Sequence, residues 1–210
     1  MARRELPEIN AGSMADIAFL LLIFFLVTTT MNVDSGISRK LPEPQAADYV
    51  PPIIKQRNVF DIVVNRNNQL LIEGTDFIKV SQLKDLVVAF IDNGGGIGNP
   101  MNGNPAEECT WCKGAKDEKS SDHPNKAIIQ LQSDRGTSYG MYISVQNEIE
   151  AAYVHLRNVY CLDNFRTSYT QLQKELKEAQ GKVAKAAIKV KIDDAKKHYP
   201  QIIAEPEPIK

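Results

Sequence analysis

Residues 14–31, MADIAFLLLIFFLVTTTM, decide the architecture of this chain, because no other segment is apolar enough to enter a lipid bilayer. No polar side chain interrupts the stretch between Ile17 and Val27. A helix that rises about 1.5 Å per residue would carry it across roughly 27 Å, close to the thickness of a hydrocarbon core. The stretch therefore predicts a single transmembrane helix over residues 14–32, followed by a water-soluble body.

Asp16 stands near the start of this apolar stretch. An ionisable side chain in a spanning helix costs about 2.5–3.5 kcal/mol near the bilayer centre and less toward an end. Such acids usually face a partner or a water-filled path rather than lipid, so Asp16 is the leading candidate functional residue. The alternative is an interfacial acid that the helix macrodipole favours at a helix N-terminus.

The apolar run is also of the length found in cleaved signal peptides, with Arg3 and Arg4 as the basic leader. Glu5 and Glu8 in that leader argue against cleavage, and no Ala-x-Ala site follows, so a retained span is favoured. The positive-inside rule then places residues 1–13 in the cytoplasm and the C-terminal body outside it.

The rest of the chain is long enough for one domain with a hydrophobic core. The formal net charge of −1 gives no support for nucleic-acid binding. Residues 33–56 form a linker whose prolines disfavour helix. This linker serves either as a passive tether or as an extended strip with which another chain pairs.

Residues 57–205 alternate between strand and helix patterns. Segments with strand patterns are residues 59–64, 70–72, 127–131 and 201–205, the first two joined as a β-hairpin. Ser81 is the predicted N-cap of a helix with one apolar face, and a longer helix carries an apolar stripe from Val145 to Tyr160. This order predicts an α+β fold with a mixed sheet packed against two helices on one face.

Residues 94–125 interrupt the pattern with an insertion rich in Gly, Asn, Pro and charge. This composition predicts a solvent-exposed loop, either ordered or disordered. The insertion contains Cys109 and Cys112, for which three interpretations compete: a redox dithiol, half of a zinc site, or a local disulfide or idle thiol pair. The third is favoured, because no strand-to-helix setting is present and His123 is the sole nearby histidine.

The C-terminal part of the chain is a charged helical region over residues 165–198, which Gly181 is expected to break, and a frayed tail over residues 206–210. The sequence has no Gly-rich phosphate loop, HExxH motif or GxSxG motif, and its three histidines are scattered. We therefore expect neither an enzyme nor a metal or cofactor site.

Several segments together resemble the ExbD/TolR family of biopolymer transport proteins, in a Bacteroidota-type variant. The resembling segments are Asp16-Ile17 with the following FLLLIFFLVTT, Leu41-Pro42, SDRGTSY at residues 133–139 and the terminal YPQIIAEPEP. The resemblance covers most of residues 9–161. The loop that contains the cysteines and the charged region after Cys161 depart from the compact family pattern.

The resemblance implies an inner-membrane protein with a cytoplasmic N-terminus and a periplasmic domain. It also implies two copies of the chain inside an ExbB-like polytopic ring, and a proton-motive force that drives protons past the acid, here Asp16. A TonB-like protein would receive the motion and energise outer-membrane import, with Leu41 and Pro42 as candidate partner-binding residues. The proton is then the coupling ion, and no cofactor is needed.

Other functions stay open at this point. One is a TolR-like subunit that couples the same motor to envelope integrity. Another is a membrane-anchored structural or binding module that moves no protons. A third is a secreted thiol protein from which the first thirty or so residues are removed.

Overall fold

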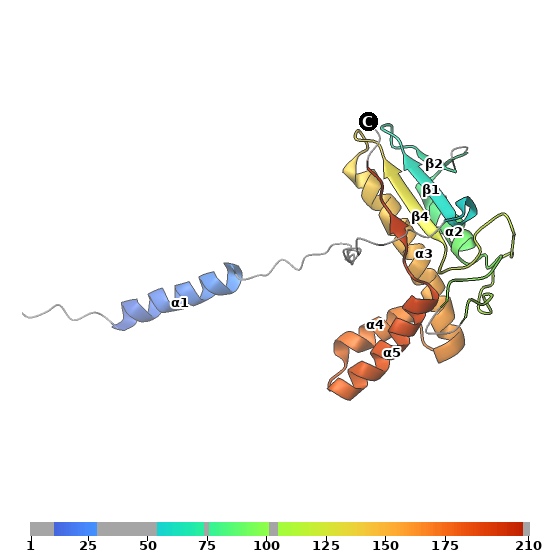
Figure 1. The fold of residues 1–210 in the computed structure, drawn as a ribbon. Coiled ribbons are helices and arrows are strands. Elements are labelled where there is room, and N and C mark those ends of the chain that lie inside the picture. Colours follow the sequence, from blue (N-terminus) through green and yellow to red (C-terminus); the bar gives the residue numbers. More distant parts are fainter. Residues whose placement is uncertain (1–10, 29–53, 74–75, 101–104, 208–210) are drawn as a thin grey trace, which may run out of the picture. The chain divides into compact units, whose positions relative to one another are not determined.

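A computed structural model describes residues 11–28, 54–73, 76–100 and 105–207 (Figure 1). The chain divides into two compact units, Met1–Val50 and Pro51–Lys210. Residues 1–10 of the predicted leader and most of the predicted linker, including Leu41 and Pro42, lie outside the described residues, while leader residues 11–13 form the first turn of a helix that begins earlier than predicted.

The described part of the first unit is one helix, α1, which spans Ala11–Thr28 and has 18 residues. Side chains from Gly12 to Phe25 are exposed in this single chain, and the hydroxyl of Thr28 donates to the carbonyl of Phe24 at 2.8 Å. Within the described residues, none of the helices is both long and apolar enough to cross a membrane. The span over residues 14–32 stays a prediction, and residues 29–32 lie outside the described part.

The second unit is built on a five-stranded sheet with the order β3-β2-β1-β4-β5. The strands are β1 Val59–Val64, β2 Leu70–Ile72, β3 Asp76–Ile78, β4 Ile128–Ser133 and β5 Ile203–Ala204. The central strand β1 pairs antiparallel with β2 and parallel with β4. β3 adds to β2 antiparallel and β5 adds to β4 parallel, so the predicted mixed sheet is confirmed. The sequence analysis missed β3, which is three residues long.

Helices α2 (Val80–Ile91) and α3 (Tyr139–Phe165) cover one face of this sheet (Figure 1). β1 alternates half-buried and buried side chains along its length, as a strand covered on one face does. The core between sheet and helices includes Ile62, Val64, Ile129, Leu131, Leu83, Val87, Ile149 and Tyr153. The predicted packing of two helices on one face is thus confirmed.

The predicted N-cap of α2 is wrong. Lys79, and not Ser81, is the N-cap residue. The backbone N–H of Lys79 donates to the side-chain oxygen of Gln82 at 3.2 Å, so the helix begins before Ser81, which is exposed. α3 has the expected kind of cap, because Ser138 accepts from the N–H of Met141 at 3.3 Å.

The charged region folds as two helices, α4 (Tyr169–Glu178) and α5 (Lys182–His198), which we call the C-terminal arm. The arm projects away from the sheet at one end of α3 (Figure 1). Gly181 separates the two helices with a φ of 97°, a conformation that favours glycine, so the predicted break is confirmed. Leu172 and Ile192 are buried between the helices and α3.

The prediction that residues 94–125 form a solvent-exposed loop is wrong for part of its length. Cys109, Ser121, Asp122 and His123 are each no more than 3% exposed. Apart from an isolated bridge between Ile97 and Glu108, the described part of the loop has no strand pairing. Its order comes from polar contacts with the end of α2 and the start of β1, which the composition of the loop does not reveal.

Candidate functional site

Asp16 is the sole ionisable side chain of α1 and lies in its second turn. Residues three and four positions apart share a helix face, so Asp16 lies in line with Gly12 and Ser13 on one side and Leu20 on the other. The small Gly12 and Ser13 leave room for the backbone of another helix to come close to the acid. The helix thus carries one carboxyl group next to two small residues, and the rest of its surface is mostly apolar.

Cys109 and Cys112 form a disulfide in the structure, with their Cα atoms 5.5 Å apart. The backbone N–H of Cys112 also donates to the Sγ of Cys109 at 3.1 Å. Gly94 makes this arrangement possible, because a Cβ at that position would lie 2.9 Å from the Cβ of Cys112. Within the described residues, no group of three or more His, Cys, Asp or Glu side chains is placed to hold a metal ion.

Asn93 joins the second half of the loop to the end of α2. Its side-chain amide is buried and donates to the carbonyls of Asp117 and Ser121 at 2.9 and 2.7 Å. Its side-chain oxygen accepts from the N–H of Asp117 at 2.9 Å. The hydroxyl of Ser121 in turn donates to the carbonyl of Phe90 at 2.5 Å. These bonds satisfy polar groups that burial would otherwise leave unpaired.

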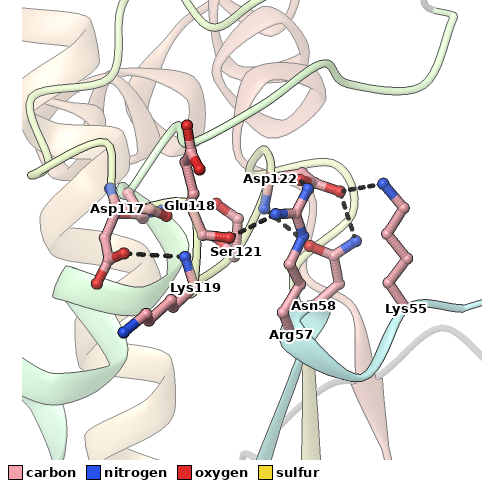
Figure 2. Close-up of polar contacts among 9 residues, drawn as sticks. Lys55, Arg57, Asn58, Asp117, Glu118, Lys119, Ser121 and Asp122 are labelled. Atoms are coloured by element: carbon pink, nitrogen blue, oxygen red, sulfur yellow. Dashed lines mark hydrogen bonds and ion pairs between the residues drawn. The ribbon is translucent and has the colours of Figure 1, made fainter.

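Asp122 holds the start of β1 through Lys55, Arg57 and Asn58, a set that we call the β1 clamp (Figure 2). The guanidinium of Arg57 donates to one carboxylate oxygen of Asp122 and to the carbonyl of Glu118. Asn58 donates to the other carboxylate oxygen at 3.1 Å and accepts from the N–H of Asp122 at 2.8 Å. Lys55 lies 3.6 Å from the same oxygen that Asn58 contacts.

The charge of Asp122 follows from these contacts. Burial by itself raises the pKa of the Asp122 carboxyl, but the Asn58 hydrogen bond and the charges of Arg57 and Lys55 outweigh that effect. The pKa of Asp122 is therefore below its ordinary value, and the side chain is an anion at neutral pH. Gly96 completes the clamp, since its N–H donates to the Asp122 carbonyl at 2.8 Å.

We call residues 94–125 the disulfide loop. Trp111, inside its C-T-W-C sequence, connects this loop to the C-terminal arm. Its ring meets the rings of His123 and His198 edge to face, with centroids 5.3 and 4.5 Å apart. His198 stacks on Tyr160 of α3 at 4.5 Å, and the Tyr160 hydroxyl donates to Asp194 at 2.8 Å. Burial, together with Asp194, raises the pKa of Tyr160, so this hydroxyl stays a donor at neutral pH.

A second contact joins the base of the C-terminal arm to the end of α2 through Tyr199, which follows α5. Its hydroxyl donates to Asp92, the C-cap residue of α2, at 2.6 Å. Burial raises the pKa of Asp92, and the hydrogen bond from Tyr199 offsets only part of that increase. The loop, the end of α2 and the base of the arm therefore form one continuous packed region.

The sequence analysis missed the buried polar residues that build this region, namely Asn58, Asn93, Asp122 and Arg157. Asn93 had a signal, because an Asn before three glycines marks the end of an apolar helix. The other three had none. Their partners lie between 42 and 65 positions away along the chain.

A family model described as biopolymer transport protein ExbD/TolR matches residues 2–157 of this chain. The chain belongs to the ExbD/TolR family. The predicted resemblance is thereby confirmed, and with it a subunit of the biopolymer transport motor type. A comparison with curated proteins found no significant match.

The ExbD/TolR match includes α1, the β1 clamp, the disulfide loop and most of α3. The end of α3, the C-terminal arm and β5 lie beyond residue 157. Proteins of the ExbD/TolR family are membrane-anchored and work with membrane-motor partners. The arm is thus an addition whose role the family match does not describe.

Proposed function

We propose that this chain is an ExbD-like subunit of an inner-membrane motor that couples the proton-motive force, through a TonB-like protein, to active outer-membrane transport. The observation that carries the proposal is the position of Asp16 as the sole ionisable side chain on the apolar helix α1. An acid in such a setting needs a polar partner or a wet path, and a proton-driven motor supplies both.

In this proposal α1 and residues 29–32 cross the inner membrane, with the N-terminus in the cytoplasm and the second unit in the periplasm. The basic leader residues Arg3 and Arg4 support this orientation. The Cys109–Cys112 disulfide also supports it, because disulfides persist in the oxidising periplasm and are rare in the cytoplasm.

Protonation of Asp16 is the proposed motor step. Two copies of α1 lie inside an ExbB-like ring, where charged Asp16 is attracted to polar groups of the ring and neutral Asp16 is not. Each protonation change therefore shifts the preferred rotational position of the helix. A proton that crosses the full membrane potential releases about 2.3 kcal/mol per 100 mV, so several protons can contribute to one useful step.

The β1 clamp suits the domain to receive a mechanical load. The clamp residues Lys55, Arg57 and Asn58 lie at the end of the predicted linker and directly after it, so a pull on the linker reaches them first. β1 is the central strand, with six paired residues along β4 and three along β2. A load along such a strand is shared by many hydrogen bonds, and the ion pairs of Asp122 resist it at the point where it arrives.

Partner recognition is proposed to use strand addition, either on the linker around Leu41 and Pro42 or at a sheet edge. The β3 edge offers side-chain contacts as well as backbone groups. Phe77 is 66% exposed and Leu86 is 40% exposed, and both line a groove between β3 and α2. An extended segment of the TonB-like protein could place alternate apolar side chains in this groove.

Replacement of Asp16 tests the motor function. In cells that depend on this chain for TonB-type nutrient uptake, Asp16→Asn is expected to abolish uptake while membrane level and co-purification with the ring protein stay normal. Asp16→Glu, which keeps an ionisable group, should retain partial uptake. Asp163→Asn, which removes an exposed acid of α3 outside the groove between β3 and α2, serves as the matched control. Normal uptake with Asp16→Asn would contradict the proton relay.

A TolR-like output is the second candidate, because the matched family includes both ExbD and TolR. The two outputs separate when detergent sensitivity of the envelope is measured in the same Asp16→Asn cells. Loss of envelope integrity with normal nutrient uptake would assign the chain to the TolR-like function. If neither output changes, the chain is an anchored binding module, and the mass of the mature N-terminus shows whether the leader is retained at all.

A further inference from the structure

The tip of the C-terminal arm, residues 174–191, is strongly basic. It contains six lysines and two glutamates, for a net charge of +4, in a chain whose overall net charge is −1. All six lysines are exposed, and none forms an ion pair with another described residue. Lys191 lies 5.7 Å from the centre of the Phe165 ring, while the other five extend into solvent.

The same tip carries an exposed apolar stripe along α5. Val183 is 85% exposed and Val190 is 69% exposed, and the exposed Ala186 and Ala187 lie between them. The spacing of three, four and seven residues places these side chains on one helix face. Ile192, on the opposite face, is buried in the core. The outward face is therefore apolar, with lysines on both flanks.

Charge decides what can cover this stripe. A second copy of the arm would bring two groups of unpaired lysines together, which is unfavourable. A helix with one apolar face and lysines at its borders has the arrangement of side chains found in helices that lie in the plane of an anionic bilayer surface. Anionic lipid headgroups attract such lysines, and the valines then enter the boundary between headgroups and acyl chains.

We propose that the tip of the C-terminal arm binds the anionic phospholipid surface of the membrane in which α1 is anchored. The inference rests on the proposed function for the presence of that membrane beside the domain. In the proposed function 21 residues, from 33 to 53, separate the span from the first described residue of the domain, and a chain of that length reaches at most about 75 Å. Trp111 packs against His198 at the base of the arm, so bound lipid would steady the disulfide loop and the domain together.

The experiment uses the full oxidised chain reconstituted into vesicles, with an environment-sensitive fluorophore on Val183→Cys. Cys161 is fully buried and the other two native cysteines are in the disulfide, so the introduced thiol is the exposed one for labelling. With about 30% phosphatidylglycerol in phosphatidylcholine, the emission is expected to shift to the blue. In pure phosphatidylcholine, and in about 0.5 M NaCl, the shift should be largely lost. The same label on Ser81→Cys, exposed on α2, should not respond.

Charge variants make the test specific. The triple variant Lys182→Glu, Lys185→Glu and Lys189→Glu should weaken the interaction of the labelled arm with anionic vesicles by at least about tenfold. A matched triple variant at exposed lysines elsewhere, Lys79→Glu, Lys116→Glu and Lys119→Glu, should leave it unchanged. Equal effects of the two triples would overturn the proposal.

Flotation of the same samples separates this inference from the proposed anchor. Flotation with pure phosphatidylcholine vesicles reports α1, and the label at position 183 reports the arm. Chains that float with both vesicle types but show no lipid-dependent shift would overturn the arm proposal and leave the anchor intact. Chains that fail to float with neutral vesicles would contradict the anchor, whereas a lysine-dependent shift on anionic vesicles would still support the arm.

Discussion

Arg57 and Asp122 lie 65 positions apart and form an ion pair at the start of the central strand β1 (Figure 2). The side chain of Asp122 is 3% exposed, while that of Arg57 is 33% exposed, so the carboxylate depends on the protein for its solvation. The pair connects the point where the chain enters the sheet to the loop that leads into β4. Together with the hydrogen bonds between Asn58 and Asp122, it joins the loop to the start of the strand.

Arg57→Gln is expected to lower the free energy of unfolding by about 1–3 kcal/mol, because it removes a charged partner from a buried carboxylate. Arg66→Gln is the matched control, since Arg66 is 71% exposed and pairs at 3.5 Å with Asp134, which is 17% exposed and therefore keeps more contact with water than Asp122. Exposed pairs of that kind contribute less than about 1 kcal/mol. Urea unfolding of the solubilised chain, followed by Trp111 fluorescence, measures both. Equal losses would contradict the clamp.

Acid unfolding should depend on Asp122. Its pKa in the folded chain lies below the unfolded value of about 3.9, so the unfolded state binds more protons in that range. The stabilisation by Asp122 is therefore complete above the unfolded pKa and is lost as the pH falls through the folded pKa. Asp122→Asn should be less stable at pH 7 and lose less stability on acidification. Parallel stability curves for the two proteins would rule out this role for Asp122.

Reduction of the Cys109–Cys112 disulfide is expected to lower the free energy of unfolding by about 2 kcal/mol, the loop-closure value for so short a loop. It should also loosen the contact of Trp111 with His198. Trp111 is the single tryptophan of the chain, so a red shift of its emission reports this directly. The Cys109→Ser, Cys112→Ser double variant should show the red shift without reductant. An unchanged spectrum would mean that the ring contacts hold the loop without the disulfide.

Arg157→Met should separate the arm from α3. Arg157 is buried, donates from Nε and Nη2 to the carbonyl of Tyr199 at 3.1 and 2.9 Å, and lies 5.6 Å from the ring centres of both Tyr153 and Tyr169. Loss of these bonds leaves a carbonyl without its partner and should cost about 1–3 kcal/mol. Arg135→Met, at an exposed position, is the control. Amide exchange should show increased opening of α5 in the first variant and no change in the second.

The parts of the fold that were predicted correctly are those with a local pattern. The alternation in residues 59–64 and the apolar stripe of α3 need no knowledge of distant residues, because each periodicity reports one buried face. β3 was missed because three residues are too few to show a period, whereas the equally short β2 was recognised as the return strand of a hairpin. Ser81 was chosen as a cap on residue type alone, whereas the N-cap is Lys79, two residues earlier, whose N–H donates to the side chain of Gln82.

The order of the disulfide loop was not predictable in the same way. Its composition is polar, and polar residues are usually exposed. That expectation fails when the fold supplies hydrogen-bond partners, which the composition does not show. Asn93 and Asp122 are buried because hydrogen bonds and ion pairs offset the loss of hydration. Those partners are brought within reach when β1 and β4 pair in parallel, which places the end of the loop beside residues 55–58.

The sequence by itself determined the chemistry of α1, an apolar helix with one carboxyl group, and it determined the ExbD/TolR family, because both depend on patterns along the chain that need no tertiary contacts. Only the tertiary structure decided that Asp122 holds the start of β1 and that Trp111 connects the disulfide loop to the arm. Such contacts depend on strand pairing and helix packing across many tens of residues. The free energy of a buried polar group is set by the partner that the fold places beside it, which no local pattern specifies.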